Sequence, residues 1–173
     1  QVAIDYYQKA LQTAQESKYQ SWEFLTYLKL IVSYYQLGEY RVTIKYYQKR
    51  LKIAQELNDR KAEGEIYSDL GFVYRSLAEY QTAIEYYQQA LDISRELNDR
   101  KAEGEIYSDL GFVYRSLAEY QTAIEYYQQA LDISRELNDR KAEGKAYHDF
   151  CDVYLSLGKY QICIAYQEEC LKI

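Results

Sequence analysis

The chain has 173 residues, of which 21 are basic and 27 acidic, so its formal net charge is −6 at pH 7. An acid excess of this kind disfavours nucleic acid as a partner. The sequence also contains no apolar run long enough for a membrane span and no secretory signal, so we expect a soluble, cytoplasmic protein with no membrane partner.

The most informative feature is an internal repeat. Residues 60–99 and 100–139 are the same forty residues, letter for letter, and the frame extends outward without insertion or deletion. We interpret 1–173 as a single array, with the second helix of a truncated unit at 1–19, full units at 20–59, 60–99 and 100–139, and a truncated last unit at 140–173. Duplicated side chains recur one step along an axis, which favours a binding surface over an enzyme pocket. We therefore expect no catalytic residues.

In chain order, the first element is a helix within residues 1–19. Its apolar side chains lack the first helix that would cover them in an array, which predicts self-association through uncapped ends. The next helix, over residues 20–37, is apolar on nearly every side. A helix of that kind is normally covered, so we expect an apolar segment of a partner or of this protein beside Leu25, Leu28 and Val32.

Each repeated unit contains two amphipathic patterns. The apolar positions of the first pattern are Ile66, Leu70, Val73 and Leu77. This spacing of three and four residues predicts a helix with one buried face, and a second run predicts another helix that continues toward Leu97, because no proline ends it. The turn at Ala78 corresponds to Gly38 and Gly158 in the flanking units, which predicts a left-handed backbone there at a cost of about 1 kcal/mol for alanine.

The last unit carries three cysteines in place of small residues. Cys151, Cys163 and Cys170 align with Gly71, Ala83 and Ala90. We interpret the cysteines as buried thiols that act as small apolar side chains. A disulfide between Cys151 and Cys163 is conceivable in a helix pair but has no secretory context, and the spacing matches no zinc pattern, so we expect no metal and no cofactor.

The order of bulky and small residues within the unit resembles a known repeat. These residues are Tyr67, Leu70, Gly71, Tyr74, Tyr80, Ala83, Tyr87 and Ala90. Their order resembles the tetratricopeptide repeat, in a forty-residue variant similar to Pins-type adaptors and bacterial arrays, with Tyr67 for the usual Trp and Arg95 for the helix-ending Pro. The resemblance implies an all-α fold, an α-solenoid of antiparallel helix pairs that forms a right-handed superhelix with a concave groove for a peptide or extended segment.

The resemblance also implies which side chains line that groove. The predicted groove residues are Leu25, Leu28, Val32, Tyr35, Glu65, Ser68, Asp69, Phe72, Arg75, Glu105, Ser108, Asp109, Phe112, Arg115 and His148. Phe72 and Phe112 are either anchors for an apolar ligand side chain or packing residues between neighbouring first helices. The flanking carboxylates favour a basic ligand. His148, the only histidine, is expected to face the groove and not to act as a catalytic base.

We interpret the array as a protein–protein interaction scaffold that binds an extended peptide or a partner helix. Two alternatives stay open. The array could be a structural spacer or self-associating protein without a dedicated ligand, or it could be a regulatory segment of a larger multidomain signalling protein. The identity of two units is consistent with a recent duplication or a designed consensus.

Overall fold

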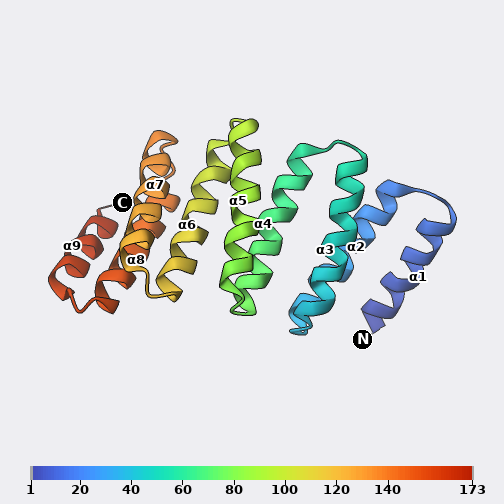
Figure 1. Ribbon diagram of the computed structural model, residues 1–173, viewed down its shortest axis with the longest axis horizontal. Coiled ribbons are helices and arrows are strands. Elements are labelled where there is room, and N and C mark those ends of the chain that lie inside the picture. The colour runs from blue at the N-terminus through green and yellow to red at the C-terminus, as the bar shows by residue number, and fades with distance from the viewer. Residues whose placement is uncertain (1, 173) are drawn as a thin grey trace.

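The computed structural model describes residues 2–172, which form nine α-helices and no strand (Figure 1). The helices are α1 (Val2–Glu16), α2 (Gln20–Gln36), α3 (Tyr40–Glu56), α4 (Arg60–Ser76), α5 (Tyr80–Glu96), α6 (Arg100–Ser116), α7 (Tyr120–Glu136), α8 (Arg140–Ser156) and α9 (Tyr160–Leu171). They stand side by side in chain order along the long axis, and each packs against its neighbours in sequence. The predicted all-α solenoid of antiparallel helix pairs is confirmed.

Aspartate starts the first helix of each unit from α4 onward. The side chains of Asp59, Asp99 and Asp139 each accept a hydrogen bond of 3.0 Å from the backbone N–H three residues later. This bond satisfies one of the donors that the first turn of a helix leaves without a partner. The caps therefore fix where α4, α6 and α8 begin.

The turns between helices use a left-handed residue, as predicted. Gly38 and Gly158 have φ values of 74° and 69°, and Ala78 and Ala118 occupy the same place with φ values of 56° and 61°. Asn58, Asn98 and Asn138 do so between units, each at 54°. Because the alanines have a Cβ that disfavours this conformation, the packing of the helices on either side must hold them there.

Tyrosine fills the space inside each helix pair. Tyr87 and Tyr127 are fully buried. Gly71 on α4 allows this, because a Cβ there would lie 2.8 Å from the ring of Tyr87; Gly111 has the same relation to Tyr127, at 2.5 Å. The glycines therefore serve close packing between the two helices of a unit.

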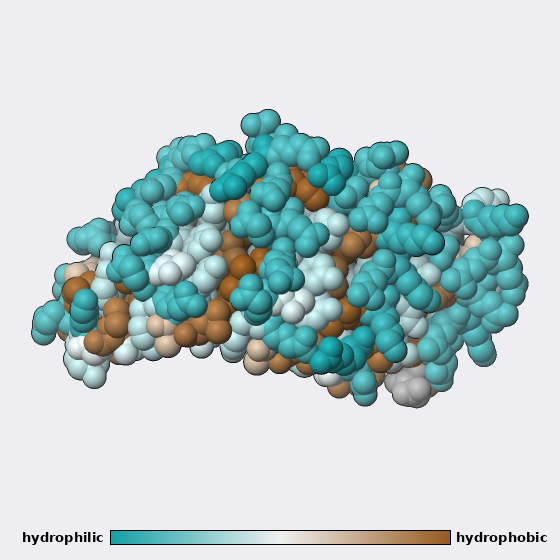
Figure 2. All heavy atoms as spheres, in the orientation of Figure 1, coloured by the Kyte–Doolittle hydropathy of each residue, from teal (hydrophilic) through white to brown (hydrophobic). Residues whose placement is uncertain are grey.

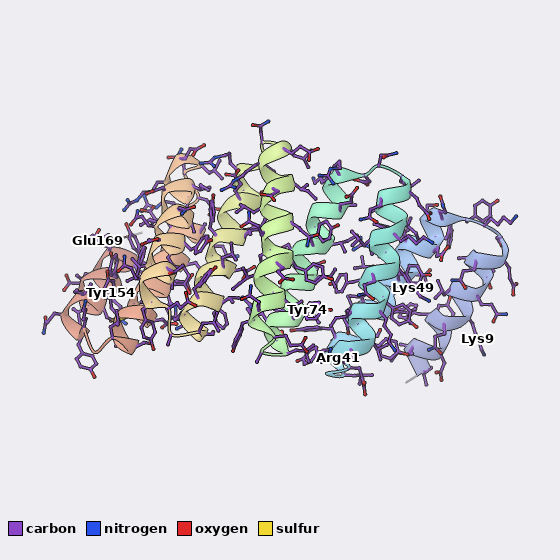
Figure 3. All side chains as sticks on the ribbon, in the orientation of Figure 1. Lys9, Arg41, Lys49, Tyr74, Tyr154 and Glu169 are labelled. Atoms are coloured by element: carbon purple, nitrogen blue, oxygen red, sulfur yellow. A yellow bond between two sulfur atoms is a disulfide. The ribbon has the colours of Figure 1, made fainter. Side chains whose placement is uncertain are left out.

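The residue before each of these buried tyrosines stacks on a tyrosine of the first helix. Tyr74 and Tyr86 have ring centroids 5.2 Å apart, and Tyr114 and Tyr126 repeat this distance. Tyr154, labelled with Tyr74 in Figure 3, stacks on Tyr166 at 5.8 Å. The adjacent tyrosines of α5 and α7 are thus packing residues.

Two of the cysteines form a disulfide, so the expectation of three buried thiols is wrong. Cys151 on α8 and Cys163 on α9 are joined by an S–S bond of 2.02 Å, with Cα atoms 4.2 Å apart. This is the pair for which the sequence left a disulfide conceivable but without a secretory context. Cys170 is a free thiol and is exposed instead of buried.

The array curves with α4, α6 and α8 on its inner side, and α2 is the first helix of the unit before them. Helix α4 approaches α6, and α6 approaches α8, with Cα atoms within 8 Å, whereas α3, α5 and α7 do not approach one another among the described residues. Figure 2 shows hydrophilic residues over most of one face, with hydrophobic residues visible in bands between them. None of the helices within residues 2–172 is both long and apolar enough to cross a membrane.

Candidate binding groove

The inner face begins at α2 with exposed apolar side chains. Leu25 is 59% exposed, Val32 is 47% exposed, and Leu28 between them is half-buried. Trp22, one turn before Leu25, is 69% exposed and was not among the predicted groove residues. We call these four residues the α2 stripe. Exposed apolar residues gathered in this way are typical of an interaction surface.

Further along the inner face, aromatic rings alternate with arginines across three helices. The Tyr35 and Phe72 rings lie 5.7 Å apart. The Arg75 guanidinium lies between Phe72 and Phe112, at 4.6 and 4.5 Å from their ring centroids, and Arg115 lies 5.1 Å from the Phe112 ring. We call these five residues the inner stack. Both phenylalanines therefore pack between neighbouring first helices, and Phe72 remains 38% exposed at the surface.

Ion pairs hold the inner stack in place. Arg75 donates a 2.7 Å hydrogen bond to Asp109 on α6, and Arg115 donates one of the same length to Asp152 on α8. Asp152 occupies the position that Phe72 and Phe112 hold in the preceding units. The second arginine therefore reaches a different carboxylate from the first, although α4 and α6 have the same sequence.

Three aspartates at equivalent positions, Asp69, Asp109 and Asp149, have different neighbours. Tyr47 lies beside Asp69, and burial together with this carboxylate raises the Tyr47 pKa. Arg75 donates a hydrogen bond to Asp109, and Ser108 donates a 3.1 Å bond to Asp149. Burial raises the pKa of each of these carboxyls above its ordinary value, despite the cations and donors that lower it. The carboxylates on this face are therefore incompletely solvated and favour a cation beside them.

A cleft opens on the inner face at the junction of α4, α5 and α6. We call it the first cleft, and its volume is about 190 Å³. Its lining includes the predicted groove residues Glu65, Ser68, Asp69 and Glu105, and also Lys61, Gly64, Ala90, Ile93, Ser94, Leu97, Asp99, Ala102 and Ile106. The second group of lining residues, from Lys61 to Ile106, was not predicted, because most of its members belong to the second helix or to the core face. The small Gly64 was the available signal, since Phe24 occupies that position in α2.

The equivalent second cleft, at the junction of α6, α7 and α8, is smaller. Its volume is about 60 Å³, and Glu105, Ser108 and Lys145 are part of its lining. The hydrogen bond from Ser108 to Asp149 joins α6 to α8 beside this cleft. Ser68, at the equivalent place in the first cleft, makes no side-chain hydrogen bond within the described part of the chain, which leaves the first cleft open.

His148 occupies in α8 the position that Ser68 holds in α4. It is exposed and lines an open hollow with Tyr147, Gln167, Cys170 and Leu171. It stays a predicted partner contact. Among the described residues, no three His, Cys, Asp or Glu side chains gather as they would around a metal ion.

Comparison with known proteins places this geometry in context. The profile of the tetratricopeptide repeat matches residues 22–96 and 102–173. A search of the curated proteins finds none that matches the sequence.

Solved structures resemble the whole array. BtubC from P. vanneervenii is 23% identical with a TM-score of 0.82, over 96% of this chain and 69% of that one. A signal transduction ATPase with a tetratricopeptide repeat sensor, from Pyrococcus horikoshii, is 21% identical with a TM-score of 0.87, over 97% of this chain and 26% of that one. A Rap protein solved in complex with competence and sporulation factor is 19% identical with a TM-score of 0.80, over 98% and 47%. At these identities the likeness concerns the fold.

Proposed function

Because this chain belongs to the tetratricopeptide repeat family, we propose that it is a protein-interaction scaffold that holds an extended segment of a partner along the inner face of α2, α4, α6 and α8. The observation that carries the proposal is the α2 stripe. Its exposed leucine, valine and tryptophan lie on the inner side of a curved array, where a bound segment would cover them.

The inner stack supports a rigid groove. Its arginines are ion-paired and its rings are packed, so little of this surface would have to be ordered when a partner binds. A preorganised surface loses less conformational entropy on association. The Rap protein among the similar structures was solved with competence and sporulation factor, which is consistent with ligand binding by an array of this shape.

The test begins with peptides selected from a random display library for binding to the chain. Their dissociation constants are then measured by fluorescence anisotropy for the wild type and for the double variant Leu25→Ser, Val32→Ser. We expect saturable binding that the double variant weakens at least about tenfold, because burying one such side chain contributes about 1.5–3 kcal/mol.

Leu37→Ser is the matched control. Leu37 lies in the turn after α2 and is 58% exposed, so the same chemical change is made at equal exposure outside the α2 stripe. Its affinity should equal that of the wild type. Selected peptides that bind the double variant as tightly as the wild type would refute the groove proposal.

Self-association is a second candidate, supported by the exposed apolar residues of α9. Ile162, Ile164 and Leu171 are 39%, 47% and 87% exposed. Light scattering over a range of protein concentrations distinguishes the two: self-association predicts a mass that rises with concentration, and the scaffold predicts a constant mass with a saturable ligand. A regulatory segment of a larger signalling protein is compatible with either, since the chain spans about a quarter of the Pyrococcus horikoshii protein.

A further inference from the structure

The first cleft combines an apolar floor with an acidic rim. Ala90, Ile93 and Ile106 are almost fully buried and form part of the floor, together with the half-exposed Leu97. The volume of about 190 Å³ exceeds the roughly 150 Å³ of a cavity that accepts benzene. The cleft is therefore large enough for an aliphatic chain of several carbons.

Carboxylates outnumber ammonium groups around the cleft. Glu65, Asp69, Asp99 and Glu105 line it, against a single Lys61. Asp99 is occupied as the cap of α6, and Glu105 lies 3.9 Å from Lys101 in a pair whose side chains are both about 70% exposed. Pairs this exposed are weak. Glu65 makes no ion pair within residues 2–172, so the rim offers unneutralised negative charge.

The second cleft provides an internal comparison. Its lining contains two carboxylates, Glu105 and Asp139, and two ammonium groups, Lys101 and Lys145. Lys145 stands where Glu65 and Glu105 stand in the identical units. The second cleft is therefore both smaller and electrically balanced, and the excess of negative charge belongs to the first cleft alone of the two.

From this geometry we infer that the first cleft receives a lysine side chain of the partner segment, with the methylenes against the isoleucines of the floor and the ammonium among the rim carboxylates. The inference rests on the proposed function and names the chemistry of one contact within it. The aliphatic stem of lysine is complementary to the apolar floor, and its charged tip is complementary to the acidic rim.

The arrangement of the carboxylates favours lysine over arginine. Glu65 and Asp69 belong to α4 and Glu105 to α6, so the acceptors surround the cleft from two helices. An ammonium donates in three directions as a compact charge, whereas a guanidinium is a planar fork that suits one bidentate carboxylate.

The position of the α2 stripe favours a peptide over a free amine. Neighbouring helices lie about 8–10 Å apart and an extended chain rises about 3.3 Å per residue, so a segment on the stripe reaches the cleft about four residues later.

The probe is a fluorescent peptide of about twelve residues with two adjacent leucines and one lysine about four residues after them, spaced as estimated above. A second peptide replaces the lysine by norleucine, which keeps the methylenes and removes the amine. We expect the lysine peptide to bind the wild-type chain about tenfold more tightly, which is the contribution of one charge-assisted hydrogen bond. An isotope-labelled lysine should show nuclear Overhauser contacts from its methylenes to the methyl groups of Ile93 and Ile106.

Glu105→Lys lowers the excess of carboxylates over ammonium groups around the first cleft from three to one, with a residue that the chain already carries at position 145. It should abolish the difference between the two peptides. The control is Glu85→Lys on α5, an exposed glutamate outside the cleft lining that changes the net charge equally. Glu85→Lys should preserve the difference, and circular dichroism should show both variants folded.

The remaining outcomes overturn the inference in distinct ways. If both peptides bind the wild type equally through their leucines, the scaffold stands and the lysine site is rejected. If Glu85→Lys weakens the lysine peptide as much as Glu105→Lys, the attraction is diffuse and not local. Competition by cadaverine at the same concentration as the peptide would assign the cleft to a free diamine. If neither peptide binds and no library peptide does, the proposed function itself fails.

Discussion

The buried tyrosines make a sharp test of how these repeats are packed, because equivalent hydroxyls have different partners. Tyr87 and Tyr127 are fully buried, and neither hydroxyl has a hydrogen-bond partner among the described residues. Tyr47, in the unit before them, lies beside the Asp69 carboxylate, and burial together with this carboxylate raises the pKa of its hydroxyl. The difference arises because Asp109 accepts its hydrogen bond from Arg75 and not from Tyr87. In the earlier unit, the residue equivalent to Arg75 is Tyr35, which carries no charge.

Removing an unpaired buried hydroxyl should stabilise the chain. A buried polar group without a partner costs about 1–3 kcal/mol, and Tyr87→Phe removes that group while it keeps the ring against Gly71. For a protein of this size, each kcal/mol shifts Tm by about 2–4 °C. Tyr127→Phe should act alike, and the effects should add because the two residues lie in different units. Tyr47→Phe should instead destabilise by about 1 kcal/mol, since it removes the hydroxyl beside the Asp69 carboxyl.

The assay is urea unfolding followed by far-ultraviolet circular dichroism at one protein concentration. Transition midpoints are compared, because repeat arrays can depart from two-state unfolding. A lower midpoint for Tyr87→Phe than for the wild type would refute the reasoning, since it would mean that the hydroxyl has a partner. Equal losses for Tyr47→Phe and Tyr87→Phe would show that the three units are packed alike.

Three further predictions use other contacts. Gly111→Ala should lower the thermal midpoint, because its Cβ would lie 2.5 Å from the Tyr127 ring, and overpacking costs about 1–3 kcal/mol. Burial raises the pKa of Asp149, so the folded chain binds this proton at a pH where the unfolded chain has released it. The stability that this proton contributes is fully present below the unfolded pKa and is lost as pH rises through the folded pKa. A carbon-13 titration of Asp149 should show a midpoint above 3.8. Reducing the bond between Cys151 and Cys163 should speed amide hydrogen exchange in α9 relative to α7, because a loop of this size contributes about 3 kcal/mol.

Local sequence rules were sufficient for the helices, their caps and their turns. The forty-residue frame placed the helices of each unit, and the glycine at Gly38 and Gly158 identified the left-handed position that Ala78 and Ala118 also adopt. These features depend on residues within about one turn of each other, so a single unit contains the information. That the predicted groove residues bind a partner stays a prediction.

The contacts between units were beyond that kind of reasoning. The bond from Ser108 to Asp149 requires knowing which residue of α8 lies beside Ser108 of α6. The inner stack requires the offset between successive units, which brings Arg75 to Phe112 and Asp109 instead of leaving it toward solvent. Neither is visible in the period, since a period states that units are alike and not how far one is displaced from the next.

Identical sequences therefore form different sites in this chain, because each unit borrows part of its surroundings from the next one. Helices α4 and α6 have the same residues, but α4 faces α6 and α6 faces α8, where Asp152 replaces a phenylalanine and Lys145 replaces a glutamate. Arg115 donates a hydrogen bond to Asp152, and Ser108 donates one to Asp149, beside the smaller second cleft. A few substitutions in the unit 140–173 thus make the first cleft, alone of the two, open and acidic, and under the proposed function this difference would fix the register of a bound segment.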